Sequence, residues 1–388
     1  STPIITGQTG IHHPLMTDTN NKNLIKISQI ALMLLLILEG SKVINLPSYV
    51  ARESGRDGWL TYVILLAMDA AVLVALLLTV KKNTLRLPME TILSRSVGKP
   101  VTKIILALYF AFFTIRILDL CITASDLFSS TLTLQTNWLG FIVPILFYVF
   151  FSARKGVRTI ARVSDILGLY VILAAVAMTA LSLTQADFSE LAPVLIDGIS
   201  PVIESIPKLC FWFADSIFIL FLLKDVKPEK NVMRTPLIAF AVGSLIVVLL
   251  YVVFFCIFGN LAQHHNGAIA KIAQFNSAFI FKGRLDWLTL IFWTLSVFIK
   301  LALMTYCALY AFDALFGIKP EKSPSLPSML VFSAIMTVLP VLTPMSAFAK
   351  NLMASPFAIV PAMIIEYLIP LLMPSFTKKA GEKEIRFG

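Results

Sequence analysis

Ten ionisable side chains fall inside long apolar stretches of this chain. A charge in such a place is costly unless it is paired or faces a cavity, and it often marks a functional site. Acidic and basic groups held away from water can bind a zwitterion, coordinate a cation or carry a proton. The ten residues are Glu39, Lys42, Asp69, Arg116, Asp119, Asp165, Lys208, Asp215, Lys300 and Glu366.

The first apolar stretch, residues 27–52, is interrupted by the run EGSK at 39–42 and followed by Pro47. Glycine weakens a helix, and proline removes a backbone donor. Within a membrane, this pattern favours a discontinuous helix whose freed backbone groups can bind a zwitterion or a cation. The alternative is a continuous, kinked helix in which Glu39 and Lys42 form a pair three residues apart.

A second candidate interruption lies in residues 203–224. Pro207 and Asp215 flank the aromatic run 211–213. Asp215 is near the middle of the stretch, so it is a candidate for contact with a cation or an amine. No glycine marks a break here, and the predicted discontinuity is therefore weaker than in the first stretch.

Two further stretches carry buried charges. Arg116 and Asp119 are three residues apart and share a helix face, so they form either a structural ion pair or a ligand contact. Lys300 has apolar neighbours on both sides. It could neutralise an acidic partner, take the place of a sodium ion or carry a transported proton, or simply form a static pair.

The other ionisable residues give weaker signals. Lys208 lies near the end of its stretch and is expected to reach water. Asp165 follows two arginines and is expected to join a surface cluster. The sequence offers no partner for Asp69 or Glu366, and their roles stay open.

Composition places the chain in a membrane. Of 388 residues, 58% are hydrophobic and only 14% are charged, against about 45–50% and about 25% in soluble domains. The mean hydropathy is +0.86. The net charge of +10 does not indicate nucleic acid, because the basic residues cluster in short loops between apolar stretches. Without a nucleophile elbow, a phosphate loop or a metal cluster, we predict no enzymatic activity, no cofactor and no metal site.

About ten stretches are long enough to cross a bilayer, which takes roughly 20 apolar residues. The sequence therefore predicts an all-α polytopic protein. A short surface helix is expected within 83–98, and the loop 260–284 is expected to hold an interfacial connector or a lid. The ten predicted spans are 27–52, 59–80, 101–128, 137–153, 160–184, 203–224, 235–259, 285–312, 327–345 and 353–374.

The loops predict the orientation. Those on one side, with both termini, hold 22 Lys and Arg residues, and those on the other side hold 6. The positive-inside rule then places both termini in the cytoplasm. We expect a flexible cytoplasmic tail at 1–24, one transmembrane domain at 25–376 and a second cytoplasmic tail at 377–388.

The chain resembles the B-subunit family of spore germinant receptors, the GerAB-like branch of the amino acid–polyamine–organocation transporter superfamily. The similarity of pattern runs over roughly residues 24–376. It is carried by ISQIALMLLLILEGSKVINLPSYVARESGRDGWL (27–60), GVRTIARVSDIL (156–167), and the region from DGISPVIESIP to FADSIFILFLLKDV (197–226). The chain departs from the family at 214–215, where Ala-Asp stands in a patch that is often Gly-Glu-like.

The resemblance implies an inverted five-plus-five, LeuT-like helical repeat with spans 1 and 6 broken around a central pocket. It also implies a subunit that senses a germinant, an amino acid or similar nutrient, with two other subunit types in the spore inner membrane. The alternatives are a cation- or proton-coupled amino-acid transporter and an ion-release channel subunit. Lys300 is the candidate for ion coupling or gating, and the candidate ligand-binding residues are Glu39, Gly40, Ser41, Lys42, Phe112, Arg116, Asp119, Phe213, Ala214 and Asp215.

Overall fold

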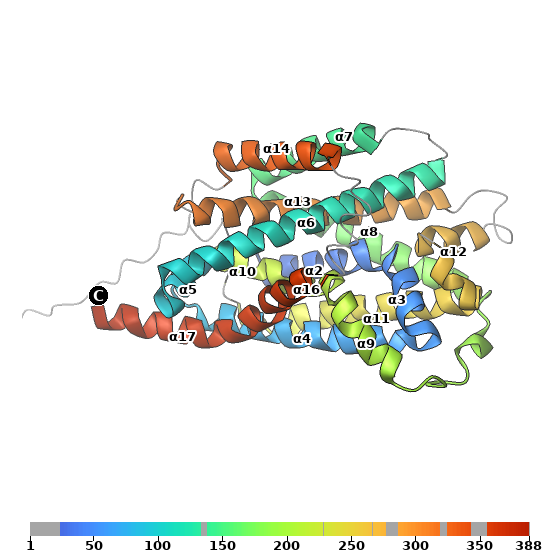
Figure 1. Ribbon diagram of the computed structural model, residues 1–388. Helices are drawn as coiled ribbons and strands as arrows, with labels where there is room; N and C mark the ends of the chain where they lie inside the picture. Colours follow the sequence, from blue (N-terminus) through green and yellow to red (C-terminus); the bar gives the residue numbers. More distant parts are fainter. Residues whose placement is uncertain are drawn as a thin grey trace, which may run out of the picture.

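The computed structural model describes residues 24–132, 138–227, 229–265, 267–276, 286–318, 324–342 and 355–387. Within these ranges all regular elements are helical, apart from one isolated β-bridge between Ile25 and Val226. Each of the ten predicted spans coincides with a helical segment (Figure 1). The predicted all-α, polytopic architecture is therefore confirmed.

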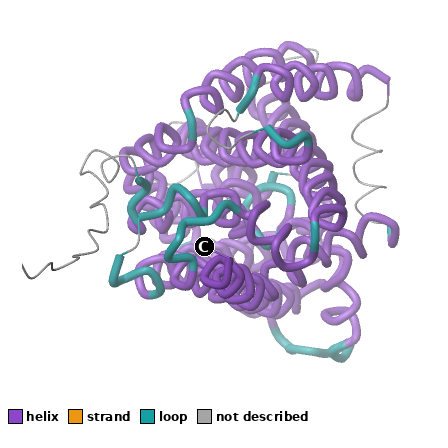
Figure 2. Tube along the Cα trace, turned by 90° about the vertical axis from the view of Figure 1, so that its left-hand side faces the viewer, coloured by secondary structure: helices purple, strands orange, loops and turns teal. Residues whose placement is uncertain are grey.

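The helices are long and lie mostly side by side (Figures 1 and 2). In chain order they are α2 (Ile27–Lys42), α3 (Leu46–Ser54), α4 (Gly58–Lys82), α5 (Met89–Val97), α6 (Lys99–Leu132), α7 (Trp138–Lys155), α8 (Val157–Leu183), α9 (Ser200–Leu209), α10 (Phe218–Leu222), α11 (Arg234–Phe258), α12 (Ala268–Asn276), α13 (Asp286–Leu315), α14 (Leu326–Leu342), α16 (Pro356–Met363) and α17 (Ile369–Phe387).

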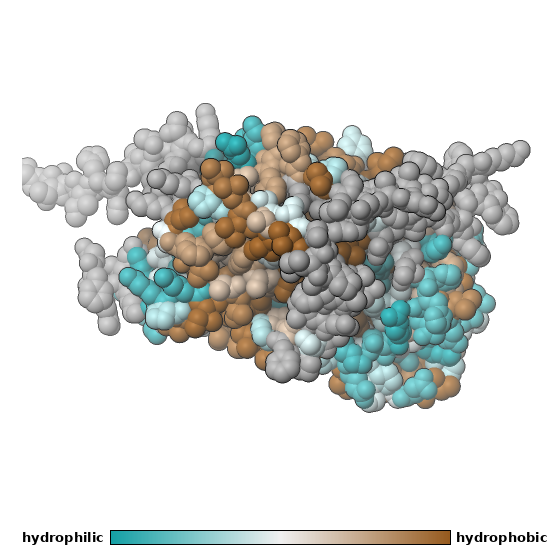
Figure 3. All heavy atoms as spheres, turned by 45° about the horizontal axis from the view of Figure 1, so that its top comes forward, coloured by the Kyte–Doolittle hydropathy of each residue, from teal (hydrophilic) through white to brown (hydrophobic). Residues whose placement is uncertain are grey.

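The surface fits a lipid environment. Seven helical segments of the described chain are long and apolar enough to cross a membrane, and Ile27–Leu38 and Leu326–Val338 are shorter apolar helices. Large apolar side chains such as Phe147 and Leu330 are exposed. Figure 3 shows hydrophobic residues across the middle of the visible face and hydrophilic residues toward its edges, with the largest group at the lower right. Exposed apolar side chains in such a band are what a bilayer-spanning bundle requires.

Helix α2 is the centre of the bundle. It packs against α8, α11 and α13, while α13 also packs along α6 and α7. Every side chain from Met33 to Leu38 on α2 is buried. Because α2 is enclosed on all these sides, Lys42 at its end faces protein rather than lipid.

The first predicted discontinuity exists, but it lies later than predicted. Helix α2 continues through Gly40 to Lys42, and the chain turns at 43–45 before α3 begins at Leu46. Pro47 explains the position, since it has no N–H to donate to the carbonyl of Val43, four residues earlier. The break is thus set by the proline, and the prediction that it falls at 39–42 was wrong.

Gly40 has a different task, close packing against α13. A Cβ atom at Gly40 would lie 3.2 Å from the Ser296 hydroxyl oxygen. The Gly40 carbonyl accepts a hydrogen bond from Trp293 Nε1 at 3.0 Å. Glycine at this position therefore lets two central helices approach closely within the bundle.

The sixth segment is broken more sharply than its sequence indicated. Helix α9 leads into a 3₁₀ turn (η3, Cys210–Trp212), and a second 3₁₀ turn (η4, Asp215–Ile217) leads into α10. Between them, Ala214 is left-handed, with φ of 53°. A non-glycine residue adopts this conformation only when its surroundings hold it there. The expectation of a weak break, based on the lack of glycine, was wrong.

The peripheral elements follow the expectations in part. Helix α5 forms within the predicted surface segment 83–98, with its apolar side chains Ile92 and Leu93 buried. The loop 260–284 contains α12, and its residues 266 and 277–284 lie outside the described chain. Helix α17 runs on to Phe387, past the domain boundary predicted at 376.

Replacing Gly58 with Ala tests the packing at the start of α4. An added methyl group would overlap the Tyr251 hydroxyl, which donates to the Gly55 carbonyl at 2.8 Å. We expect Gly58→Ala to lower stability by about 1–3 kcal/mol through overpacking. Thermal unfolding of the purified protein measures this, with Gly381→Ala as control, because nothing lies within 4 Å of that added methyl group. An unchanged melting temperature in Gly58→Ala would contradict the packing described here.

Candidate functional site

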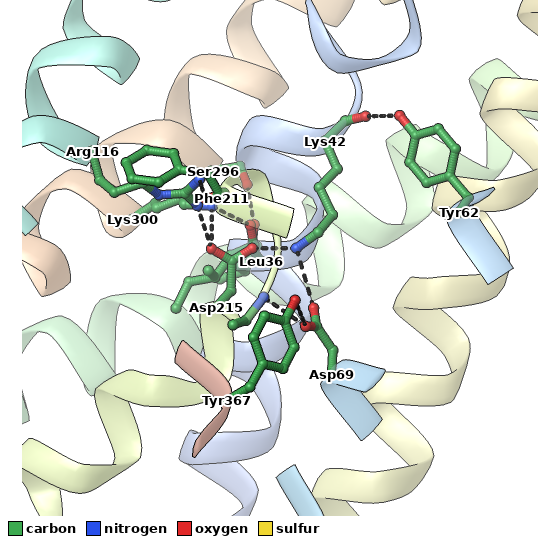
Figure 4. A network of polar contacts seen from close by, with 12 residues as sticks. Leu36, Lys42, Tyr62, Asp69, Arg116, Phe211, Asp215, Ser296, Lys300 and Tyr367 are labelled. Atoms are coloured by element: carbon green, nitrogen blue, oxygen red, sulfur yellow. Dashed lines mark hydrogen bonds and ion pairs between the residues drawn. The ribbon is translucent and has the colours of Figure 1, made fainter. Parts of the chain in front are cut away.

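The two breaks meet at one buried carboxylate, that of Asp215 (Figure 4). Its Oδ1 accepts from Lys300 Nζ at 2.7 Å and from Arg116 Nη2 at 3.0 Å, and its Oδ2 pairs with Lys42 Nζ. The side chains of all four residues are at most 3% exposed. Three cations from α2, α6 and α13 thus converge on one anion at the break of the sixth segment.

Aromatic rings and a backbone carbonyl complete the surroundings of the cations. Arg116 also donates to the Phe211 carbonyl and lies over the Phe211 ring, 5.4 Å from its centroid. Lys42 Nζ lies 4.9 Å from the centroid of Phe213. Such cation–π contacts are strengthened where water is excluded. The two hydrogen-bond partners of Arg116, Phe211 and Asp215, both belong to the broken sixth segment. Arg116 therefore joins α6 to η3 and η4.

Asp69 of α4 holds the second break in place. Its Oδ1 accepts from the Ala214 backbone N–H at 2.6 Å and from the Tyr367 hydroxyl at 3.4 Å. Its Oδ2 lies 4.0 Å from Lys42 Nζ. The break leaves the backbone N–H of Ala214 without a helical partner, and the Asp69 carboxylate accepts a hydrogen bond from it. Asp69 therefore explains how alanine can occupy this position.

The carbonyl groups of α2 are also bonded by side chains. Tyr62 donates to the Lys42 carbonyl at 3.0 Å, and Trp293 Nε1 of α13 donates to the Gly40 carbonyl at 3.0 Å. Unbonded carbonyls at a helix end would be costly in a water-free interior. The break in the first segment is therefore held by groups from α4 and α13.

A small cavity adjoins the charge cluster, with room for little more than a water molecule. Arg116 and Asp215 supply its polar wall. Apolar side chains and the Ala214 break form the rest, so a compound with one charged end and an apolar body would match it in chemistry. The other lining residues are Ile37, Phe112, Phe113, Phe213, Ala214, Ile217, Phe218, Leu303 and Met304.

Further contacts join α3, which follows the first break, to α9 and η3, which precede the second. Glu53 Oε2 on α3 lies 2.5 Å from Lys208 Nζ on α9. Tyr49 and Trp212 stack with their ring centroids 5.5 Å apart. Lys208 is about half exposed, as expected for a side chain that reaches water.

A second set of contacts ties the start of α2 to its neighbours. Gln29 Nε2 donates to Asp165 Oδ2 on α8 at 2.7 Å. Ile25 exchanges two backbone hydrogen bonds with the chain that follows α10, one to the Asp225 carbonyl and one from the Lys227 amide, both at 2.8 Å. Asp165 is exposed, consistent with its predicted place at the surface. The start of α2 is thus tied both to α8 and to the chain after α10.

The structure brings together most of the predicted site residues. Lys42, Arg116, Asp215 and Lys300 form one network, and Phe112, Phe213 and Ala214 line the cavity with two of them. Gly40 lies on α2, two residues before Lys42, and packs against Ser296 of α13.

Three predicted residues are placed otherwise. Asp119 is half-buried on α6 and does not line the cavity. The side chains of Glu39 and Ser41 lie outside the described part of the structure, so the pair proposed between Glu39 and Lys42 is not placed there either. Lys42 instead reaches Asp215 in the sixth segment, 173 positions away.

Sequence reasoning left Asp69 and Glu366 without a role, although both are fully buried. Asp69 contacts the backbone of Ala214, at the break of the sixth segment. A contact between residues so far apart in the chain cannot be predicted from a local sequence pattern. Tyr367, its hydroxyl partner, was not singled out at all. The available signal was an isolated acid in a strongly apolar stretch, which predicts a partner without identifying it.

Comparison with known proteins now decides the family. The family model described as spore germination protein, a spore permease, matches residues 24–348. The chain belongs to this spore germination protein family. It is 23% identical to spore germination protein KB of Bacillus subtilis, over 78% of this chain and 80% of that protein. It is 22% identical to spore germination protein YndE of the same organism, over 84% of this chain and 88% of that protein.

Solved structures support the fold of this family member. A mutant of the manganese transporter from Eremococcus coleocola superposes with a TM-score of 0.51 at 14% identity, over 92% of this chain and 86% of the transporter chain. Identity this low shows the fold alone. The spore germination protein described here therefore has a transporter fold with interrupted first and sixth segments.

Removing the charge of Asp215 should destabilise the protein strongly. Asp215→Asn leaves three buried cations with too little negative charge, and loss of one partner of a buried pair costs about 3–5 kcal/mol. Thermal unfolding of the purified variant measures the loss. The double variant Asp215→Asn with Lys300→Met should recover part of the stability, because it removes one of the excess cations.

The pair between Glu53 and Lys208 offers a matched control. Lys208→Met breaks an ion pair of similar length, 2.5 Å, at a partly exposed position. Exposed pairs contribute about 0–1 kcal/mol. Equal melting temperatures for Asp215→Asn and Lys208→Met would show that the buried cluster does not hold the bundle together.

Proposed function

We propose that this protein is the germinant-sensing subunit of a germination receptor in the spore inner membrane. The germinant is an amino acid or a similar small nutrient, and it binds where the two broken segments meet. The protein is a multi-pass membrane protein of the spore germination family. Membership of this family supports a role in germination, and the site geometry supports a small ligand.

One observation carries the proposal, the charged wall of the cavity. Lys42, Arg116 and Lys300 face Asp215, and Lys42 also has Asp69 at 4.0 Å. Arg116 in the cavity wall has the donor geometry that suits a ligand carboxylate, and Asp215 beside it suits a ligand amine.

The breaks offer a route from binding to a signal. The cavity is too small for an amino acid, so binding requires the half-helices around it to move apart. The polar contacts that join α3 to α9 and α2 to α8, those of Lys208 with Glu53 and of Gln29 with Asp165, are partly exposed, which suits elements that move. In this proposal, two other receptor subunit types respond to the movement, and both termini lie in the cytoplasm.

A coupled transporter is the second candidate, because the superposed structure is that of a manganese transporter. In this reading the same cluster binds the substrate, and Lys300 takes part in coupling to a cation or a proton. An ion-release channel subunit is the third, in which the pocket only gates a pore. All three use the same fold, so only ligand flux or current separates them.

A thermal-shift panel of amino acids, sugars and purines tests the proposed site. The compound that raises the melting temperature most should carry a carboxylate. Met304→Phe fills the cavity wall and should weaken its binding at least tenfold. Met178→Phe makes the same change at a buried position that does not line the cavity, and should leave binding unchanged. Equal binding by both variants would place the site elsewhere.

Flux measurements with the same compound separate a sensor from a carrier. In proteoliposomes loaded with unlabelled compound, a sensor shows no counterflow of the labelled compound, whereas a transporter exchanges it. Robust counterflow would overturn the sensor assignment. Ion currents from the purified chain without ligand would favour the channel.

A further inference from the structure

Glu366 lies in a π-helical turn, Ile364–Leu368 (η7), between α16 and α17. The sequence accounts for this irregular turn. Pro370 has no N–H to donate to the Glu366 carbonyl four residues earlier. The neighbouring Ile365 carbonyl instead accepts from the Tyr109 hydroxyl of α6 at 2.8 Å. π-Turns of this kind occur frequently at functional sites.

The carboxyl group of Glu366 is buried without a hydrogen bond. The residue is 0% exposed, and neither carboxylate oxygen accepts a hydrogen bond from the described part of the protein. Asp215 differs, since three cations contact it, and Asp69 accepts a backbone N–H. An ionised carboxylate without a partner is strongly disfavoured in such an interior.

The surrounding charges of the described chain do not offer Glu366 a partner of its own. Arg116 already contacts Asp215 and the Phe211 carbonyl, and Lys42 already contacts Asp215. The two nearby carboxylates repel a further negative charge. The titratable groups that face Glu366 are Tyr109 and Arg116 of α6, Lys42 of α2, Asp69 of α4, Cys210 of η3, Asp215 of η4 and the adjacent Tyr367.

We propose that Glu366 is a proton-binding site whose carboxyl group holds a proton in this buried arrangement. The proton neutralises a buried acid that the described residues of the cluster leave without a partner. A proton satisfies it better than a metal ion, because Arg116 and Lys42 would repel a second cation nearby.

The proton on Glu366 also sets the charge of the site. With Glu366 protonated, the site carries one negative charge less than it does after the proton is released. Protonation of Glu366 would therefore favour binding of a ligand carboxylate. This consequence for ligand binding rests on the proposed function, whereas the protonation of Glu366 does not.

Infrared spectroscopy of the purified protein tests the proposal without any ligand. A protonated carboxyl group absorbs at the C=O stretch of a carboxylic acid, and this band should shift on H/D exchange and disappear in Glu366→Gln. Glu204→Gln is the matched control, because Glu204 is exposed and accepts from Ser200. That variant should keep the band. A band that persists in Glu366→Gln, or is missing from the wild-type protein, would overturn the proposal.

Two further measurements keep the test decisive if Glu366→Gln folds poorly. Labelling the wild-type protein with ¹³C-carboxyl glutamate should shift the band, which identifies it as glutamate rather than Asp69 or Asp215. Glu366→Gln imitates the protonated acid and should keep the wild-type melting temperature at neutral pH. A large loss of stability together with an unshifted band would show that Glu366 is ionised. Stabilisation of the wild type by sodium, lost in Glu366→Gln, would show a cation site instead.

Discussion

The attraction between Asp215 and three buried cations is the constraint on which the centre of this protein depends. Lys42, Arg116 and Lys300 come from three different helices, and all reach one carboxylate that lies at a break. In a low-dielectric interior, each of these charges would be unstable alone. The network therefore fixes the relative positions of α2, α6, α13 and the sixth segment at the same time.

The breaks and the charges depend on each other. A broken helix exposes backbone groups, and here side chains from α4 and α13 bond them. Asp69 receives the Ala214 amide, and Lys300 reaches both the Ile37 carbonyl and Asp215. Irregular backbone is tolerated at membrane depth when it is buried in protein or lines a cavity. The cost of the breaks is thus offset by the same residues that form the candidate site.

Much of this arrangement was predictable from the sequence, because hydropathy and buried charge are local signals. The ten spans and the importance of Lys42, Arg116, Asp215 and Lys300 follow from apolar stretches and from ionisable residues within them. The partners of these charges were not predictable. Lys42 pairs with a residue 173 positions away, and no spacing rule reaches that far.

The errors have a common physical cause. Gly40 was expected to mark a break, but its missing side chain serves close helix packing. The lack of glycine was expected to make the break of the sixth segment the weaker one, but Asp69 holds Ala214 in a left-handed conformation. In both cases a tertiary contact decides the backbone, and local propensity does not. The likeness to the spore germination family, rather than these contacts, supports a role in germination.

An experimental structure with the compound from the ligand panel bound tests the central claim most directly. The account predicts that the compound lies between the two broken segments, with its carboxylate in contact with Arg116 or Lys300. It also predicts that the half-helices around the present cavity have separated. A ligand bound outside these segments, with the Asp215 network unchanged, would contradict the account.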